Sequence, residues 1–175
     1  MNYFELFGIP VSLQVDPSWL RRRYYELSRQ YHPDMHTQAG AAEQADMLEK
    51  SALVNQAFKV LGNEHDLLQY VLELKGLLTE GDKHPLPQLF LMEMMDINEK
   101  LIELEYDPDE EAIAALHQDV TAMEDELYDE VAGIVAKFNE VEAPPSAMDK
   151  LKDYYYKRKY LLRIQEKLST FASRN

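Results

Sequence analysis

Apolar residues recur at steps of three and four along most of the chain, a spacing that is typical of amphipathic helices. In the first half, Asp16 can cap a helix whose first position is Pro17, and Pro33 must end that helix because proline lacks a backbone donor. Gly62 separates two later helices. We therefore expect four helices in the first half, over about 3–7, 17–31, 41–61 and 64–75.

The second half begins with GLLTEGDKHPLPQ, whose two glycines and two prolines predict a linker over 76–87. Three long apolar patterns with short connections then predict an antiparallel three-helix bundle over 88–175. Asp107 and Pro108 are expected to open its second helix, and Ser146 its third. The apolar seam of the second helix is Ile113, Leu116, Val120, Met123, Leu127, Val131, Ile134, Phe138 and Val141. The predicted fold class is all-α, a helical hairpin with short flanking helices followed by the bundle.

Composition narrows the range of functions. The chain has 175 residues, no cysteine and a formal net charge of −14. Without cysteine there is no disulfide and no thiolate metal site, and the negative charge disfavours binding to the phosphates of nucleic acids. No apolar run approaches the ~20 residues that span a bilayer, and the amino terminus lacks the pattern of a leader peptide. We expect a cytoplasmic protein with no nucleic-acid or membrane partner.

The charge is unevenly distributed in the second half. Residues 93–130 carry 15 acidic side chains and one basic one, whereas residues 150–174 carry 8 basic and 2 acidic side chains. One interpretation is that neighbouring helices pair their charges with each other. The other is that a partner protein binds an acidic face, and the pattern alone leaves both open.

The stretch RQYHPDMH holds the residues with the most obvious chemistry. His32, Asp34 and His36 could be metal ligands, but Pro33 keeps the local chain extended and no third histidine or cysteine lies nearby. No nucleotide-binding or nucleophile motif is present anywhere in the chain. We therefore expect no catalytic residue, no metal and no cofactor, and the loop becomes a candidate surface for a protein partner.

Residues 1–75 resemble the J domain of DnaJ-type co-chaperones, through YFELFG, LRRRYYELSRQY, HPD and VNQAFKVL. The resemblance implies that His32, Pro33 and Asp34 contact a DnaK-type ATPase chaperone and stimulate its ATP hydrolysis. Arginines on the preceding helix, Arg21, Arg22 and Arg29, would give a basic face that steers encounter. Many J domains carry further basic residues where this chain has Tyr25, Glu26 and Met35, which indicates a specialised chaperone partner.

The first bundle helix has two apolar lines where one is needed. Phe90, Met94, Ile97, Leu101 and Leu104 suit the core. The second line lies beside acidic residues and predicts a binding surface, with broad burial or simple exposure as the alternatives. This second line, with its acidic neighbours, consists of Leu91, Met92, Met95, Asp96, Glu99 and Glu103.

Over nearly its full length the chain resembles the HscB-type co-chaperones of iron–sulfur cluster biogenesis, through RQYHPD, SALVNQAF, YVLELKG and FLME. That family recruits the scaffold protein IscU to the chaperone HscA. The resemblance implies that the six residues of the second line bind the scaffold, together with an aromatic residue of the last helix that we assign to Tyr155. We expect a monomeric adaptor that is not an enzyme. A J-domain co-chaperone with a different client is the alternative.

Overall fold

The computed structural model describes residues 1–138 and 143–172, and within these ranges every regular element is a helix. This confirms the all-α prediction. Val141, which the sequence placed in the seam of a helix, lies outside the described residues. The helices are α1 (Tyr3–Phe7), α2 (Pro17–Gln30), the 3-10 turn η1 (Pro33–His36), α3 (Ala41–Leu61), α4 (Glu64–Leu74), α5 (Gln88–Tyr106), α6 (Glu110–Ala136) and α7 (Pro145–Ala172).

The described residues divide into two compact units. The first comprises 1–79 together with 136–138 and 143, and the second comprises 80–135 and 144–172. Each unit has its own buried apolar residues and is described by itself below. The domain limits that the sequence suggested, a first domain ending at 75 and a bundle starting at 88, remain predictions.

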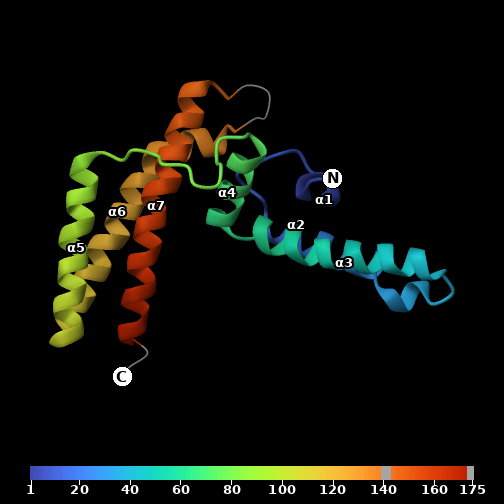
Figure 1. Ribbon diagram of the computed structural model, residues 1–175, viewed down its shortest axis with the longest axis horizontal. Coiled ribbons are helices and arrows are strands. Elements are labelled where there is room, and N and C mark those ends of the chain that lie inside the picture. The colour runs from blue at the N-terminus through green and yellow to red at the C-terminus, as the bar shows by residue number, and fades with distance from the viewer. Residues whose placement is uncertain (139–142, 173–175) are drawn as a thin grey trace. The chain divides into compact units, whose positions relative to one another are not determined.

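The first unit is built around the α2–α3 hairpin, whose two helices lie side by side (Figure 1). Tyr24 joins them twice: its ring stacks on Phe58 at 4.2 Å and its hydroxyl donates to Asn55 Oδ1 at 2.9 Å. Each fully buried leucine or valine between them contributes about 1.5–3 kcal/mol to folding. The buried residues of the hairpin are Leu20, Leu27, Val54, Ala57 and Leu61.

Short helices fix the base of this hairpin. The side chain of Asn2 caps α1, which ends at Gly8 in the left-handed region with φ 74°. The α1 carbonyl of Phe7 accepts a hydrogen bond from Arg23 Nε at 3.1 Å. Arg23 also donates to Glu26 at 3.0 Å, so this arginine holds the fold together and is not available to a partner.

In the second unit, α5, α6 and α7 form the predicted bundle (Figure 1). Its core takes one stripe from each helix, such as Leu101 from α5, Val120 from α6 and Leu161 from α7, which are 2%, 0% and 0% exposed. The buried stripe of α5 is the line of five residues that the sequence assigned to the core.

Two local details of α6 differ from the sequence prediction. The helix begins at Glu110, and Asp109 rather than Asp107 caps it, accepting a hydrogen bond from the backbone of Glu111 at 3.1 Å. Asp107 instead follows the last turn of α5 and cannot serve both helices. The helix ends at Ala136, before Phe138, so the predicted seam is helical as far as Ile134.

Candidate functional site

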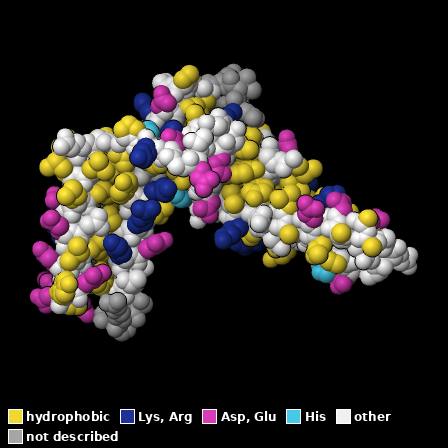
Figure 2. Space-filling model, in the orientation of Figure 1, with side chains coloured by type: hydrophobic (Ala, Val, Ile, Leu, Met, Phe, Trp, Pro, Cys, Tyr) yellow, Lys and Arg dark blue, Asp and Glu magenta, His cyan; other side chains and the backbone are white. Residues whose placement is uncertain are grey.

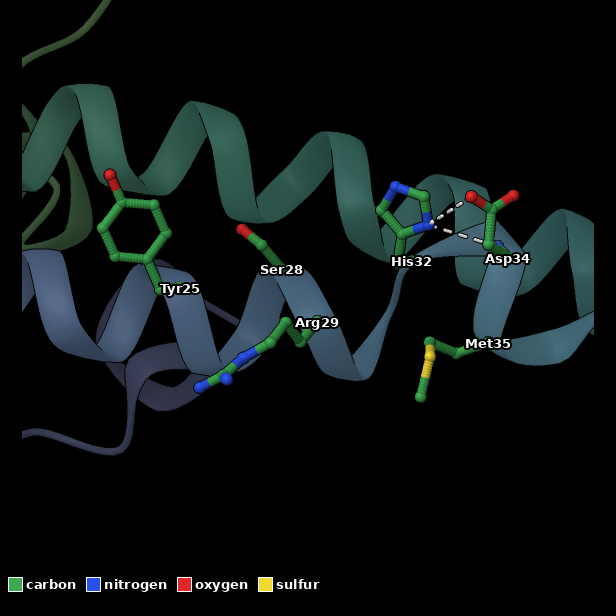
Figure 3. Close-up of a pocket in the computed structure, with 6 residues that line it drawn as sticks. All are labelled: Tyr25, Ser28, Arg29, His32, Asp34 and Met35. Atoms are coloured by element: carbon green, nitrogen blue, oxygen red, sulfur yellow. Dashed lines mark hydrogen bonds and ion pairs between the residues drawn. The ribbon is translucent and has the colours of Figure 1, made fainter.

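The His-Pro-Asp loop caps its own 3-10 turn. His32 has an extended backbone with ψ 131°, which Pro33 favours in the residue before it, and η1 begins at once with Pro33. The Nδ1 atom of His32 accepts a hydrogen bond from the backbone N–H of Asp34 at 3.2 Å (Figure 3). The imidazole therefore acts as an N-cap and is held in one orientation while it remains exposed.

This hydrogen bond also determines which nitrogen carries the proton. Because Nδ1 accepts from a backbone N–H, the neutral ring carries its hydrogen on Nε2. In Figure 3 the Nε2 edge points away from the loop, whereas Nδ1 faces Asp34. The Asp34 carboxylate lies 3.6 Å from Nδ1 and its side chain is 87% exposed. The loop thus presents an oriented donor, the Nε2–H of His32, next to an exposed carboxylate on the surface.

Backbone contacts hold the rest of the loop. The Met35 N–H donates to the His32 carbonyl at 3.0 Å, and His36 Nε2 lies 2.8 Å from the Gln30 carbonyl. His36 is therefore tied back to the end of α2. The two imidazoles point their nitrogens at different backbone groups, which is not the convergence that a metal site built on His32 and His36 requires.

The arginines that the sequence proposed lie on the surface of α2. Arg21, Arg22 and Arg29 are exposed, and within the described residues no carboxylate lies within ion-pair distance of any of them. They are thus unlike Arg23, which is bound to Phe7 and Glu26. A partner with acidic groups can pair with them without breaking an existing contact.

A hollow of about 550 Å³ lies beside the loop, lined by Tyr25, Ser28, Arg29, His32, Asp34 and Met35. Figure 3 shows the guanidinium of Arg29 turned away from the Asp34 carboxylate. Tyr25 and Met35 are 58% and 72% exposed, so the charged loop is flanked by apolar surface.

On α5, the second apolar line is exposed. Leu91, Met92 and Met95 are 37%, 54% and 64% exposed, and they lie opposite the buried stripe that contains Met94 and Leu101. The acidic residues Asp96, Glu99 and Glu103 are exposed beside them. Of the alternatives left open by the sequence, broad burial does not describe this line.

The exposed face of α5 extends further than the sequence analysis recognised. Ile102 and Tyr106 are 54% and 87% exposed and continue the face that holds Met92 and Met95, at helical steps of three and four. The signal was present in the sequence, because both residues fall outside the core line. Together, Leu91, Met92, Met95, Asp96, Glu99, Ile102, Glu103 and Tyr106 are called the α5 strip below.

The tyrosine of α7 that the sequence assigned to this surface is buried. Tyr155 is 5% exposed and its ring contacts that of Tyr156, so it offers a partner little surface. Tyr160 is exposed and packs edge-on against Phe90, with ring centroids 6.1 Å apart. Three consecutive tyrosines gave no way to decide from the sequence which one faces outward.

The end of the predicted linker is attached to α7. Asp82 accepts a hydrogen bond from Lys152 Nζ at 2.8 Å, which lowers the pKa of its carboxyl below the ordinary 3.8. His84 Nε2 lies 3.2 Å from Asp153 Oδ1, and the His84 ring stacks on Tyr156. We call this arrangement the 82–84 attachment. Sequence analysis missed it, because the pairs join residues about seventy positions apart.

Neighbouring groups in the 82–84 attachment shift each other's pKa values. Burial alone would raise the pKa of the Asp153 carboxyl, but hydrogen bonds from Lys157 and His84 outweigh burial and lower it. Burial raises the pKa of the Tyr156 phenol, and the nearby Asp82 carboxylate adds to the shift. The attachment is therefore strongest when both carboxylates are ionised.

The described residues offer neither a metal-binding cluster nor a membrane-spanning helix. In 1–138 and 143–172, no group of three or more histidine, aspartate or glutamate side chains is placed to hold a metal ion. Over the same ranges, no helix combines the length and apolar character needed to cross a membrane.

Comparisons with known proteins cover both units. A family model described as the DnaJ domain matches residues 2–70, and one described as the HSCB C-terminal oligomerisation domain matches residues 86–169. Proteins described as co-chaperone protein HscB homologues from Vibrio vulnificus, strains YJ016 and CMCP6, are each 32% identical over 170 residues. Each alignment spans 96% of this chain and 95% of the relative.

Solved structures resemble the whole chain. The chaperone HscB from Vibrio cholerae matches with a TM-score of 0.79 and 26% identity, covering 99% of each chain. The crystal structure of the human co-chaperone protein HscB matches with a TM-score of 0.79 and 29% identity, covering 98% of this chain and 82% of that one. Sequence and fold comparisons thus agree over nearly the full length.

Proposed function

This chain belongs to the HscB family of co-chaperones, and from that premise we propose that it delivers an iron–sulfur scaffold protein of the IscU type to an ATPase chaperone of the HscA or DnaK type. The chain does not itself hydrolyse ATP. It brings two proteins together and stimulates the ATPase of one of them. We assign stimulation of the ATPase to a J domain over 1–75 and binding of the scaffold to a bundle over 88–175, with 76–87 as the connection.

The observation that carries this proposal is the His-Pro-Asp loop, anchored through the backbone with its polar side chains outward. The Asp34 N–H bond to Nδ1 leaves the Nε2–H of His32 free to donate, next to an exposed carboxylate. A donor that is already oriented loses little conformational freedom on binding. The Asp34 carboxylate beside it adds a negative charge. If they fit one conformation of the chaperone better than the other, they shift it toward the conformation that hydrolyses ATP.

The positive charge on α2 would act before the loop makes contact, while the two proteins approach each other. Arg21, Arg22 and Arg29 form an exposed basic face in a chain of net charge −14. An acidic surface on the chaperone would be attracted to this face and repelled by most of the remainder. Steering of this kind selects the orientation in which the loop reaches its site.

The α5 strip is proposed to bind the scaffold. It combines exposed leucine and methionine side chains with carboxylates on a regular helix, which suits a partner with an apolar patch bordered by basic groups. Met92 and Met95 can adapt their side chains to that patch, because methionine is unbranched and flexible. The strip points away from the core, so binding requires no rearrangement of the bundle.

The protein is expected to act in the cytoplasm as a monomer, without a cofactor. The cluster would stay with the scaffold, because this chain has no cysteine with which to ligate iron.

Titration calorimetry against an IscU-type scaffold tests this proposal, followed by a steady-state ATPase assay of an HscA-type chaperone. We expect binding to the scaffold, and ATPase stimulation by this chain that increases when the scaffold is added. Absence of scaffold binding would refute the delivery function. Stimulation without scaffold binding would favour the alternative, a J-domain co-chaperone for another client, and a pull-down with the chaperone would then identify that client.

A further inference from the structure

A second hollow in the bundle lies where the 82–84 attachment meets α7. Its volume is about 290 Å³. Its lining combines basic and aromatic side chains from the chain before α5 and from two turns of α7. These residues are Asp82, Lys83, His84, Leu86, Tyr156, Lys159, Tyr160 and Arg163. None of them belongs to the loop or the α5 strip.

The charges of this hollow are not balanced from within the bundle. Asp82, the one carboxylate in its lining, is already paired with Lys152. Within the described residues, no carboxylate lies within ion-pair distance of Lys83, Lys159 or Arg163. Elsewhere on α7, Lys152 and Lys157 each have a carboxylate partner at 2.8 and 2.9 Å. Three cations without a carboxylate partner therefore surround one hollow in an acidic protein.

Aromatic packing gives the hollow a fixed shape. The His84 ring stacks on Tyr156 with centroids 4.9 Å apart and planes 9° apart. Lys159 Nζ lies 5.7 Å from the ring centroid of Tyr155 and 5.9 Å from that of Tyr156, so its ammonium is positioned over aromatic faces. A cation held in this way loses little freedom when it binds an anion.

The hollow adjoins the amino-terminal end of α5. Leu86 packs on the bundle core immediately before α5, and Tyr160 contacts Phe90 in the first turn of that helix. In Figure 2 dark blue side chains run along α7 on the same visible face as the yellow and magenta side chains of α5. A protein that covers the start of the α5 strip can therefore also reach the basic hollow.

We propose that this hollow binds carboxylate side chains of the scaffold protein, using Lys83, Lys159 and Arg163. The inference rests on the proposed function and adds a second contact to it. The scaffold would place basic groups against Asp96, Glu99 and Glu103 of the strip, and acidic groups in the hollow. Opposite charges at the two positions allow one orientation of the scaffold and penalise the reversed one.

Charge reversal in the hollow tests the proposal. The double variant Lys159→Glu with Arg163→Glu should weaken scaffold binding about tenfold or more in calorimetry, and the loss should shrink at high salt. Lys159→Gln with Arg163→Gln, which only removes the charges, should lose less. Lys150→Glu is the matched control, because Lys150 is an exposed α7 lysine outside the hollow and should keep wild-type affinity.

A compensating charge change in the scaffold can identify the scaffold residue that contacts the hollow. Acidic surface residues of the scaffold can be replaced by lysine, one at a time. One of these scaffold variants should bind the chain with Lys159→Glu and Arg163→Glu better than it binds the wild-type chain. Unchanged affinity in both double variants would overturn the inference and leave the proposed function in place. No binding by the wild-type chain would instead refute the proposed function. A change in self-association without a change in scaffold affinity would assign the hollow to a second copy of this chain.

Discussion

The His-Pro-Asp loop and the α5 strip expose their residues in opposite ways. In the loop, His32 is fixed by a hydrogen bond from the Asp34 backbone, so its ring nitrogens have a defined direction. On α5, the exposed side chains belong to a regular helix whose opposite face is buried, and Leu91, Met92 and Met95 present apolar surface to solvent. If both surfaces bind partners as proposed, recognition by the loop should depend on the positions of single hydrogen-bonding atoms, and recognition by the strip on the total apolar area that is buried.

This difference has a consequence for mutation. A contact made by oriented hydrogen-bonding atoms is lost when one atom is removed or displaced. An apolar contact shared by several adaptable side chains loses affinity in proportion to the area and packing that are removed. The loop should therefore fail abruptly on a single substitution, whereas the strip should weaken by degrees.

The largest expected effect is loss of chaperone stimulation in His32→Gln. Glutamine cannot both accept from the Asp34 N–H as an N-cap and present a donor at the position of Nε2, so the activating contact is lost. We expect stimulation of an HscA-type ATPase to fall to the basal rate in a steady-state assay, with an unchanged circular dichroism spectrum because His32 is exposed.

His36→Gln is the matched control for that variant. His36 contacts the Gln30 carbonyl through Nε2, and a glutamine amide can donate to the same oxygen. Stimulation should therefore stay near the wild-type level. Equal loss in both variants would show that general disturbance of the loop, and not the atoms of His32, accounts for the effect.

The next prediction concerns the two faces of α5. Leu101 is 2% exposed and Ile102, its neighbour, is 54% exposed. Leu101→Ala leaves a cavity in the bundle core and should lower the free energy of unfolding by about 2–5 kcal/mol. Ile102→Ala should change it by less than about 0.5 kcal/mol. Urea unfolding of the two variants measures both, and similar losses would contradict the division into a core face and a binding face.

Much of this fold could be predicted from local signals. Asp16 and Pro17 mark the start of α2, and Gly62 and Asn63 separate α3 from α4, because caps act on atoms within one turn. The core stripe of α5 followed from its spacing alone. The resemblance to the family then predicted which exposed residues bind the chaperone and the scaffold.

Other features depend on contacts that no local signal encodes. The His84–Asp153 pair joins residues 69 positions apart, and both appear in the sequence as ordinary polar residues of a turn and a helix. That Tyr154 and Tyr155 are buried while Tyr160 is exposed depends on how α7 is rotated in the bundle. Helix periodicity fixes the spacing between residues but not the rotation of the helix against its neighbours.

We expect scaffold affinity to fall by degrees as side chains of the α5 strip are truncated. Leu91→Ala combined with Met95→Ala should weaken scaffold binding by about 2–4 kcal/mol, the range of interface hot spots. Each single variant should lose only part of this. Stimulation of the chaperone ATPase without scaffold should not change, because the loop is untouched. Titration calorimetry measures the affinities, and Leu48→Ala, which truncates a leucine that is 62% exposed on α3, is the control. Complete loss in either single variant would mean that the strip, like the loop, depends on one residue.

The smallest expected effect is a pH dependence of the 82–84 attachment, which borders the start of the strip. The carboxyls of Asp82 and Asp153 have folded pKa values below the ordinary 3.8, so they stabilise the bundle above that pH and lose the contribution as pH falls through their folded values. The stability lost below about pH 4 should therefore be smaller in Asp82→Asn, which has no charge to lose at this position. Urea unfolding at several pH values measures the difference, and the wild-type and variant curves should converge in acid. Parallel curves would show that the Asp82–Lys152 pair is too exposed to contribute, and would leave the stacking of His84 on Tyr156 as the contact that holds this segment against α7.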